Sequence, residues 1–400
     1  MKLDLSRPLE NLFSRASFGI YIHVPFCMRR CRYCAFVSST PAHVPDQAYT
    51  EAILTEFAMR IGDYANHSLK TLYFGGGTPT MLPDAAIGRI VEKIVHQCGS
   101  PDEITLEANP EHVSSERSRN WKSIGFTRVS LGVQSFDSAM LAFLGRRHDA
   151  RMALDAVSHL TNAGFGEISI DLIYGGQTEC QDPIARWRRD LEAARDSGAK
   201  HVSCYELTIE PHTPLWTMQK RGTPVVCSDD AIADMMAIIP ETLGMMRYEI
   251  SNYCRDGYAS AHNLSCWSGL SYLGLGAGAH SLLVRGEQIT RQANTRDPRR
   301  YMAALNAETP ALPEPDFVEH LTPRAHLAER LMCAARTRLA FNPNEIAAQI
   351  GADPAPYIPG LQKAVSRGLI ESLPNAQMRT TPNGISLNNL LDEMIFEGYE

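Results

Sequence analysis

Three cysteines at CxxxCxxC spacing stand in the stretch Tyr21-Ile-His-Val-Pro-Phe-Cys27-Met-Arg-Arg-Cys31-Arg-Tyr-Cys34-Ala-Phe36. The alternating, β-rich residues 18–24 predict a first strand, which puts the cysteines on the loop that follows it. Three thiolates on one short loop can bind three corners of an iron–sulfur cube, and the fourth iron then has no protein ligand. A structural zinc site would require a fourth protein ligand, and His23 and His43 are nearby candidates. The stretch therefore predicts a metal-binding loop.

The composition is that of an ordinary soluble globular protein, long enough for one large domain and a smaller one. The chain has 400 residues, of which 44% are hydrophobic and 21% are charged. Its net charge of -7 gives no reason to expect nucleic acid or an anionic membrane as a partner, although Arg29, Arg30 and Arg32 form a local basic patch. The most apolar run, residues 272–284, is too short to span a bilayer.

The use of cysteine indicates a reducing compartment. The chain has 10 cysteines, and those outside the triad are scattered, which is typical of small buried hydrophobic residues. Residues 1–8 lack the apolar core of a signal peptide, so we expect a cytoplasmic protein. In that setting a tight cysteine cluster indicates metal binding rather than disulfides.

Strand and helix patterns alternate after the cysteine loop. Strands are predicted at 18–24, 71–74, 103–107, 127–133, 167–172 and 200–207, with helices between them at 46–64, 83–96, 115–124, 138–144, 150–163 and 183–197. Such repeats imply a parallel sheet, because each crossover helix returns the chain to the same end. Six repeats are fewer than the eight of a closed barrel, so we predict an α/β fold with a partial (β/α)6 barrel. A doubly wound open sheet is the alternative.

Polar residues fall at or just past the carboxyl ends of all six predicted strands. They are the cysteine triad, Gly75–Thr78, Glu107, Gln134, Asp171 and Glu206. This rim is where barrel enzymes place their active sites, and the placement favours the barrel.

The domain organisation is predicted from changes in pattern along the chain. We expect a lead-in at 1–16, the barrel at 17–284, a connector at 285–315 and a winged-helix-like domain at 316–400. The last domain is predicted to begin with a helix over 318–336.

The cysteine stretch, together with Gly75-Gly-Gly-Thr-Pro-Thr80 after the next strand, resembles the radical S-adenosylmethionine (SAM) superfamily. It is most similar to the oxygen-independent coproporphyrinogen III oxidase group. The resemblance implies that Cys27, Cys31 and Cys34 ligate a [4Fe-4S] cluster and that SAM chelates its open iron. Further SAM-contacting positions implied by it are Tyr21, Tyr33, Gly76, Gly77, Thr78, Glu107, Gln134, Arg146 and Asp171.

Three features resemble the haem chaperone HemW branch of that group more than the oxidase branch. Phe36 stands where the oxidase has a fourth cysteine, and only 20 residues precede Tyr21, where the oxidase has a longer extension. The segment His262-Asn-Leu-Ser-Cys266-Trp267 resembles the HNxxYW haem-binding motif, which implies a haem contact at His262. Cys266 stands where the motif has a tyrosine, and its thiolate is a second candidate haem ligand unless the change weakens the site. The alternative function is coproporphyrinogen III oxidation by radical SAM chemistry.

The haem chaperone resemblance also implies partners. They are haem, a haem-acceptor protein that could be membrane-associated, and an electron donor such as flavodoxin or ferredoxin. We assign no catalytic residue. The sequence departs from the family pattern at Cys266, which replaces a tyrosine, at His212, which replaces a glycine, and in the loop Tyr174–Thr178, which is two residues shorter.

Overall fold

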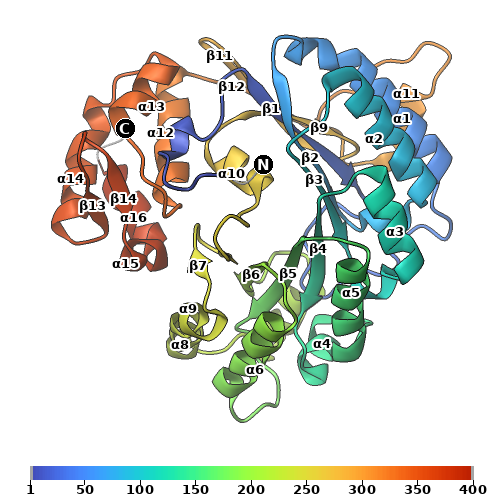
Figure 1. Cartoon of the computed structure of the whole chain (residues 1–400), viewed down its shortest axis with the longest axis horizontal. Helices are drawn as coiled ribbons and strands as arrows, with labels where there is room; N and C mark the ends of the chain where they lie inside the picture. The colour runs from blue at the N-terminus through green and yellow to red at the C-terminus, as the bar shows by residue number, and fades with distance from the viewer. Residues whose placement is uncertain (1–2, 398–400) are drawn as a thin grey trace.

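The computed structural model describes residues 3–397, and its centre is a curved sheet whose first six strands run parallel in chain order (Figure 1). These strands are β1 (Ser17–Val24), β2 (Ser68–Gly76), β3 (Glu103–Ala108), β4 (Arg128–Gln134), β5 (Glu167–Tyr174) and β6 (His201–Glu206). Each is hydrogen-bonded to the next in parallel register. The six predicted strands are therefore all present, and their carboxyl ends share one edge.

The crossover helices cover the outer face of this sheet, whereas one short helix, α10 (Ala261–Trp267), lies on its inner side (Figure 1). The outer helices are α1 (Asp46–Arg60), α2 (Asp84–Cys98), α3 (Ser115–Ile124), α4 (Ser138–Leu144), α5 (Ala150–Asn162) and α6 (Pro183–Asp196). Coverage of one face by the crossover helices is the arrangement of a partial barrel rather than of a doubly wound sheet, which has helices on both faces. The predicted fold class is confirmed.

Alternation along β1 explains how the two faces differ. Ile20, Ile22 and Val24 are fully buried in the core beneath the outer helices. Each such side chain contributes roughly 1.5–3 kcal/mol when it leaves water. Tyr21 and His23 lie between them in sequence and therefore point to the inner face. The strand that carries the cysteine loop is thus fixed by its outer face, which leaves its inner face free for polar groups.

The described residues place twelve strands in this sheet, more than the sequence indicated. β9 (Ser271–Leu275) pairs in parallel with β1, and β10 (His280–Arg285), β11 (Gln288–Ala293) and β12 (Phe317–Leu321) continue from it as antiparallel strands. At the other edge β8 (Asn252–Cys254) and β7 (Met246–Arg247) follow β6. The segment expected to be a connector therefore contains β11, whose polar sequence QITRQA gave no strand signal although it pairs with both β10 and β12. The helix expected to start at 318 begins only at Pro323, after the edge strand β12.

A second hydrophobic cluster lies in the carboxyl-terminal part of the chain. Its elements are α12 (Pro323–Ala335), α13 (Pro343–Ile350), α14 (Ile358–Ser366), β13 (Ile370–Ser372), β14 (Met378–Thr380), α15 (Pro382–Ser386) and α16 (Asn388–Ile395). The lead-in packs into it, because Leu9 and Leu12 are buried there and the backbone N–H of Leu9 donates to the carbonyl of Ala340 across 2.8 Å. The segment expected as a mere lead-in is thus a strap between β1 and this cluster.

The remaining helices connect these parts. They are α7 (Pro214–Lys220), α8 (Asp229–Ala237), α9 (Ile239–Leu243) and α11 (Pro298–Leu305), with 3-10 turns at Leu9–Asn11, Ile61–Tyr64, Pro79–Met81, Pro110–His112 and Ala355–Tyr357. Within residues 3–397, none of the helices has the length and apolar character needed to cross a membrane.

Candidate functional site

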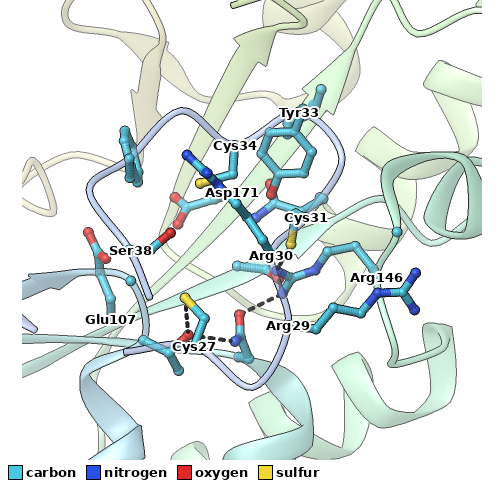
Figure 2. Close-up of a pocket in the computed structure, with 18 of the residues that line it drawn as sticks. Cys27, Arg29, Arg30, Cys31, Tyr33, Cys34, Ser38, Glu107, Arg146 and Asp171 are labelled. Atoms are coloured by element: carbon cyan, nitrogen blue, oxygen red, sulfur yellow. Dashed lines mark hydrogen bonds between the residues drawn. The ribbon is translucent and has the colours of Figure 1, made fainter. Parts of the chain in front are cut away.

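The cysteine loop is pinned at both ends and in its middle. The N–H of Cys27 donates to the carbonyl of Ser39 across 2.9 Å, and the N–H of Ser39 donates to the carbonyl of Pro25 across 2.6 Å. These two bonds form a parallel β-bridge between Phe26 and Ser39, which joins the two ends of the loop. In its middle, the N–H of Arg32 donates to the carbonyl of Leu144 at the end of α4 across 3.0 Å. These bonds fix the loop over the carboxyl end of the sheet (Figure 2).

A cavity of about 450 Å³ lies beneath this loop, at the carboxyl ends of the parallel strands. All three cysteines of the triad line it. So do the candidate SAM residues Tyr33, Gly76, Gly77, Thr78, Glu107, Gln134, Arg146 and Asp171. Tyr21 does not line the cavity; its hydroxyl lies 3.0 Å from His23 Nδ1 on the inner face of β1. The loop and the strand ends therefore assemble one site from distant parts of the chain.

The three thiols are free and partly exposed. Arg146 Nη1 donates to Cys31 Sγ across 3.5 Å, and Thr78 Oγ1 donates to Cys27 Sγ across 3.6 Å. Burial raises the pKa of the Cys27 and Cys34 thiols, so a cationic centre is needed to hold them as thiolates at neutral pH.

The donor set fits an iron–sulfur cube better than a single metal ion. Among the described residues, no three or more His, Cys, Asp or Glu side chains are close enough together to hold one ion. A cube takes each cysteine on a different iron, so its ligands need not converge on a point. His23 uses both ring nitrogens, on Tyr21 and on the carbonyl of Val37, and His43 lines a separate hollow beside α1. Neither histidine supplies the fourth ligand that zinc would require.

The glycines after β2 are required by close contacts. Gly76 has a φ of 110°, and a Cβ there would lie 2.6 Å from the His23 ring. A Cβ on Gly77 would lie 2.9 Å from the carbonyl oxygens of Phe26 and Val24 and 3.0 Å from Cys27 Sγ. The bare backbone of this turn is therefore what lets β2 and the cysteine loop lie against each other.

Two half-buried carboxylates line the inner wall of the cavity. Glu107 accepts from the hydroxyl of Tyr73 across 2.7 Å and from the N–H of Gly76 across 3.2 Å. Asp171 accepts from Ser203 Oγ across 2.7 Å and from Ser130 Oγ across 3.1 Å. Burial raises the pKa of Glu107 to about 7 and that of Asp171 to about 6. A cationic ligand in the cavity would favour their ionised forms.

Arg146 and Gln134 complete the wall. Arg146 Nη2 donates to Asn109 Oδ1 and to the carbonyl of Gly132, each across 2.6 Å, while its Nε is buried without a partner. Gln134 has a φ of 68° beside a bulge in β4, a conformation that is uncommon for a non-glycine residue and turns its side chain toward the cavity. A guanidinium held in this way can bind a carboxylate.

Sequence reasoning missed Tyr73 and Asn109. Both support residues that it named, because Tyr73 donates to Glu107 and Asn109 accepts from Arg146. Tyr73 could have been found from alternation along β2, and Asn109 from its place two residues beyond Glu107.

The two candidate haem residues lie elsewhere, on α10. His262 is buried, with 7% of its surface exposed, and its Nδ1 lies 2.9 Å from Thr71 Oγ1 near the start of β2. Burial lowers the pKa of His262 to about 4. Cys266, one turn later, is an exposed residue. Its thiol is nevertheless shielded from solvent by neighbouring residues, and this desolvation raises the pKa of Cys266 to about 11. Neither residue lines the cavity beneath the cysteine loop.

Comparison with known proteins decides the family. The radical SAM superfamily model matches residues 21–191. The haem chaperone HemW of Mycobacterium tuberculosis is 35% identical over 330 residues, which cover 80% of this chain and 82% of that protein. The chain belongs to the HemW family. HemW of Escherichia coli is 32% identical over 298 residues, which cover 73% of this chain and 77% of that protein.

The chain also shares its fold with a solved enzyme. The structure of coproporphyrinogen III oxidase (HemN) from Escherichia coli, a radical SAM enzyme, has a TM-score of 0.76 with 20% identity and covers 95% of this chain and 90% of that one. At that identity the likeness shows the fold alone. The predicted membership in the radical SAM superfamily, close to HemW, is confirmed.

The structure shows the surroundings of two positions where the sequence was expected to depart from the family pattern. His212 has a φ of 66°, in the left-handed region where a glycine is unstrained, so the replacement carries backbone strain. The shortened loop Tyr174–Thr178 is braced by Arg186, which donates to Thr178 Oγ1 across 2.6 Å and to the carbonyl of Gly176 across 2.9 Å. These two hydrogen bonds fix the loop to α6, the helix that carries Arg186.

Proposed function

We propose that this HemW-family protein binds haem and transfers it to an acceptor protein, and that it carries a [4Fe-4S] cluster and SAM in the cavity beneath the cysteine loop. The observation that carries the cofactor part is that the three cysteines and all candidate SAM residues except Tyr21 line one cavity. The haem part rests on family membership. When bound in this cavity, the cluster and SAM would supply one-electron chemistry, while the residues of the chain hold and orient them.

The residues of the cavity have separable roles in this proposal. Cys27, Cys31 and Cys34 hold the cluster, and the bare backbone at Gly76 and Gly77 receives the amino group of SAM. Arg146 is aimed by Asn109 toward the cavity and pairs with a carboxylate. Glu107, Asp171 and Tyr33 enclose the remainder of the ligand and exclude water from it.

For haem, Cys266 is the more accessible of the two candidates. The residue is exposed, although neighbouring residues shield its thiol, whereas His262 is packed in the interior and its Nδ1 already lies at hydrogen-bond distance from Thr71. A thiolate is an established type of axial haem ligand, as an imidazole is. We therefore propose that Cys266 contacts haem first, and that a direct contact from His262 would require movement of α10.

The test is a haem titration of anaerobically reconstituted protein followed by its Soret band. The wild type is expected to bind haem, Cys266→Ser to alter the position of the Soret band, and Cys98→Ser, a cysteine at the end of α2, to behave as wild type. Absence of any haem binding by the wild-type protein would overturn the chaperone proposal.

The alternative function, oxidation of coproporphyrinogen III, is favoured only by the shared fold. It is tested on the same sample by an anaerobic assay with a reductant and SAM. Formation of protoporphyrinogen would support the oxidase and count against the chaperone; SAM cleavage without that product is compatible with the chaperone.

An electron donor would have a distinct place to dock. Met28 and Phe36 are 51% and 64% exposed on the cysteine loop, and Arg29 and Arg30 between them are also exposed. An apolar and basic surface of this kind suits an acidic flavodoxin or ferredoxin. We propose that such a protein docks there in the cytoplasm. Reduction of the cluster should slow as salt is raised, and Arg29→Glu with Arg30→Glu should slow it at low salt; a salt-independent rate would contradict this docking.

A further inference from the structure

His262 lies directly behind the wall of the SAM cavity. Its ring stacks on the ring of Tyr73 with a centroid distance of 4.6 Å and an interplanar angle of 24°. On the far side of Tyr73, the hydroxyl of that residue donates to Glu107 across 2.7 Å. We infer that His262 is a positioning residue for the SAM site, acting through Tyr73 on Glu107. The inference rests on the proposed binding of SAM in this cavity.

Strand β2 provides both contacts of the histidine ring. Thr71 and Tyr73 are two residues apart and therefore point to the same inner face of the sheet. Thr71 Oγ1 lies 2.9 Å from His262 Nδ1, and Tyr73 supplies the stacking surface. Because a hydrogen bond in the ring plane and a stacked ring face restrain different directions, the imidazole is held in a defined orientation against Tyr73.

Tyr21 packs against both of these rings, with its ring centroid 6.0 Å from that of Tyr73 and 6.4 Å from that of His262. The three rings therefore form one cluster, which restrains the ring of Tyr73 while its hydroxyl donates to Glu107. Removal of the imidazole takes away the ring that lies nearest to Tyr73. The hydroxyl of Tyr73 then loses the support that keeps it on the carboxylate.

Strand β3 anchors α10, the helix that carries His262, and so fixes the position of that histidine. Glu103 and Glu107 are four residues apart on this strand and face the same side. Glu103 accepts from the backbone N–H groups of Ala261 and His262, each across 3.0 Å, and so anchors the start of α10. The amino end of β3 therefore anchors α10 through Glu103, and the carboxyl end of the same strand carries Glu107, the candidate SAM-binding carboxylate.

The electrostatic state of His262 suits a positioning role. Burial lowers its pKa to about 4, so the ring is neutral at physiological pH. A neutral ring stacks on Tyr73 without placing a positive charge near a site that is to receive a cationic ligand. An imidazolium at this place would instead repel the ligand.

The experiment measures SAM affinity of the holoprotein with its reconstituted cluster, for wild type, His262→Ala, Tyr73→Phe and the double variant. The loss of one ring stack is expected to weaken SAM binding about 3- to 10-fold in His262→Ala. Because the effect passes through the Tyr73 hydroxyl, His262→Ala should add little in the Tyr73→Phe background. Independent effects that multiply in the double variant would overturn the inference.

The pH dependence of SAM affinity is a second readout, which a general loosening of the fold would leave unchanged. The groups that face Glu107 are Tyr21 on β1, Tyr73 on β2, Asp171 on β5 and Tyr205 on β6. The Tyr73 hydrogen bond favours ionised Glu107, so its loss should move the acidic limb of SAM binding to higher pH in both single variants. An unchanged limb in His262→Ala would overturn the inference.

His201→Ala is the matched control. His201 is also a buried histidine on the inner side of the sheet, and its Nε2 lies 2.8 Å from the hydroxyl of Tyr248. Its ring stands against Tyr248 rather than Tyr73, so its removal should leave the pH profile of SAM binding unchanged. If wild-type protein bound no SAM, the proposed cofactor site itself would fail; if it bound SAM but not haem, only the chaperone proposal would fail.

Discussion

The guanidinium of Arg128 donates to the carboxylate of Glu103 across 2.9 Å, and both side chains are almost fully buried at the amino-terminal end of the sheet. Arg128 also donates to the carbonyls of Tyr258 and Ala259, just before α10. Glu103 in turn accepts from the first N–H groups of α10. This one ion pair therefore joins β3 and β4 to the segment that carries His262.

Replacement of Arg128 by Met should destabilise the protein strongly. Glu103 would remain buried without its charge partner, and such losses lower the free energy of unfolding by about 3–5 kcal/mol. Denaturant unfolding of the apo-protein measures it. The exposed pair between Arg151 and Asp155, at 3.8 Å, is the control, and Arg151→Met should change the stability by less than about 0.5 kcal/mol. Equal effects of the two changes would refute the structural role given to Arg128.

Replacement of Cys31 or Cys34 by Ser should abolish the cluster. A serine oxygen does not replace a thiolate on iron, so the iron content and the sulfide content of the reconstituted protein should both decrease. Cys98→Ser serves as the comparison, because this residue ends α2 and does not line the cavity. A full complement of iron in the Cys31 variant would remove the triad as the cluster site.

Replacement of Gly77 by Ala should prevent the loop and β2 from lying together. Its Cβ would stand 2.9 Å from two backbone carbonyl oxygens, which cannot move without displacing Cys27. We expect loss of the cluster, measured as iron content, and weaker SAM binding. Gly62→Ala is the control, since no atom lies within 4 Å of a Cβ there. Wild-type iron content in Gly77→Ala would show that the contact tolerates a side chain.

Glu107 should make the ligand-free protein less stable as pH rises. Burial raises its pKa from 4.5 to about 7, so the folded state binds more protons than the unfolded state between these values. The contribution of Glu107 to stability is therefore full below pH 4.5 and is lost as pH rises to 7, by up to about 3 kcal/mol.

The measurement is the difference in unfolding free energy between wild type and Glu107→Gln across this pH range. The difference removes the contribution of His262 and His326, whose lowered pKa values act with the opposite sign. A difference that stays constant from pH 4.5 to 7 would contradict the raised pKa of Glu107.

The sequence allowed the parallel strands and the cavity residues to be predicted, because both depend on local patterns. Buried parallel strands are apolar runs, and the residues at their carboxyl ends meet at one edge whatever the details of packing. For this reason Glu107 and Asp171, on β3 and β5, could be assigned to the same site from the amino-acid pattern alone.

The edge strands and the surroundings of α10 could not be predicted in the same way. β11 is polar because it lies near the edge of the sheet, so it has no strong hydrophobic signal. His262 was singled out by a motif, but its stacking on Tyr73 depends on α10 folding back inside the curved sheet. Contacts of this kind join residues that are far apart along the chain, and they leave no trace in local periodicity.

The contacts of the lead-in with the carboxyl-terminal part of the chain can form only late in synthesis. The carboxylate of Glu10 accepts from the N–H of Asn342, 332 residues later, and the two segments lie together near α12 (Figure 1). At about 5–20 residues per second, a ribosome needs roughly 17–66 s to make the intervening chain. Until then Leu9 and Glu10 lack the partners Ala340 and Asn342, so the residues before β1 reach their final place only after most of the chain has been made, although β1 itself can already pair with β2.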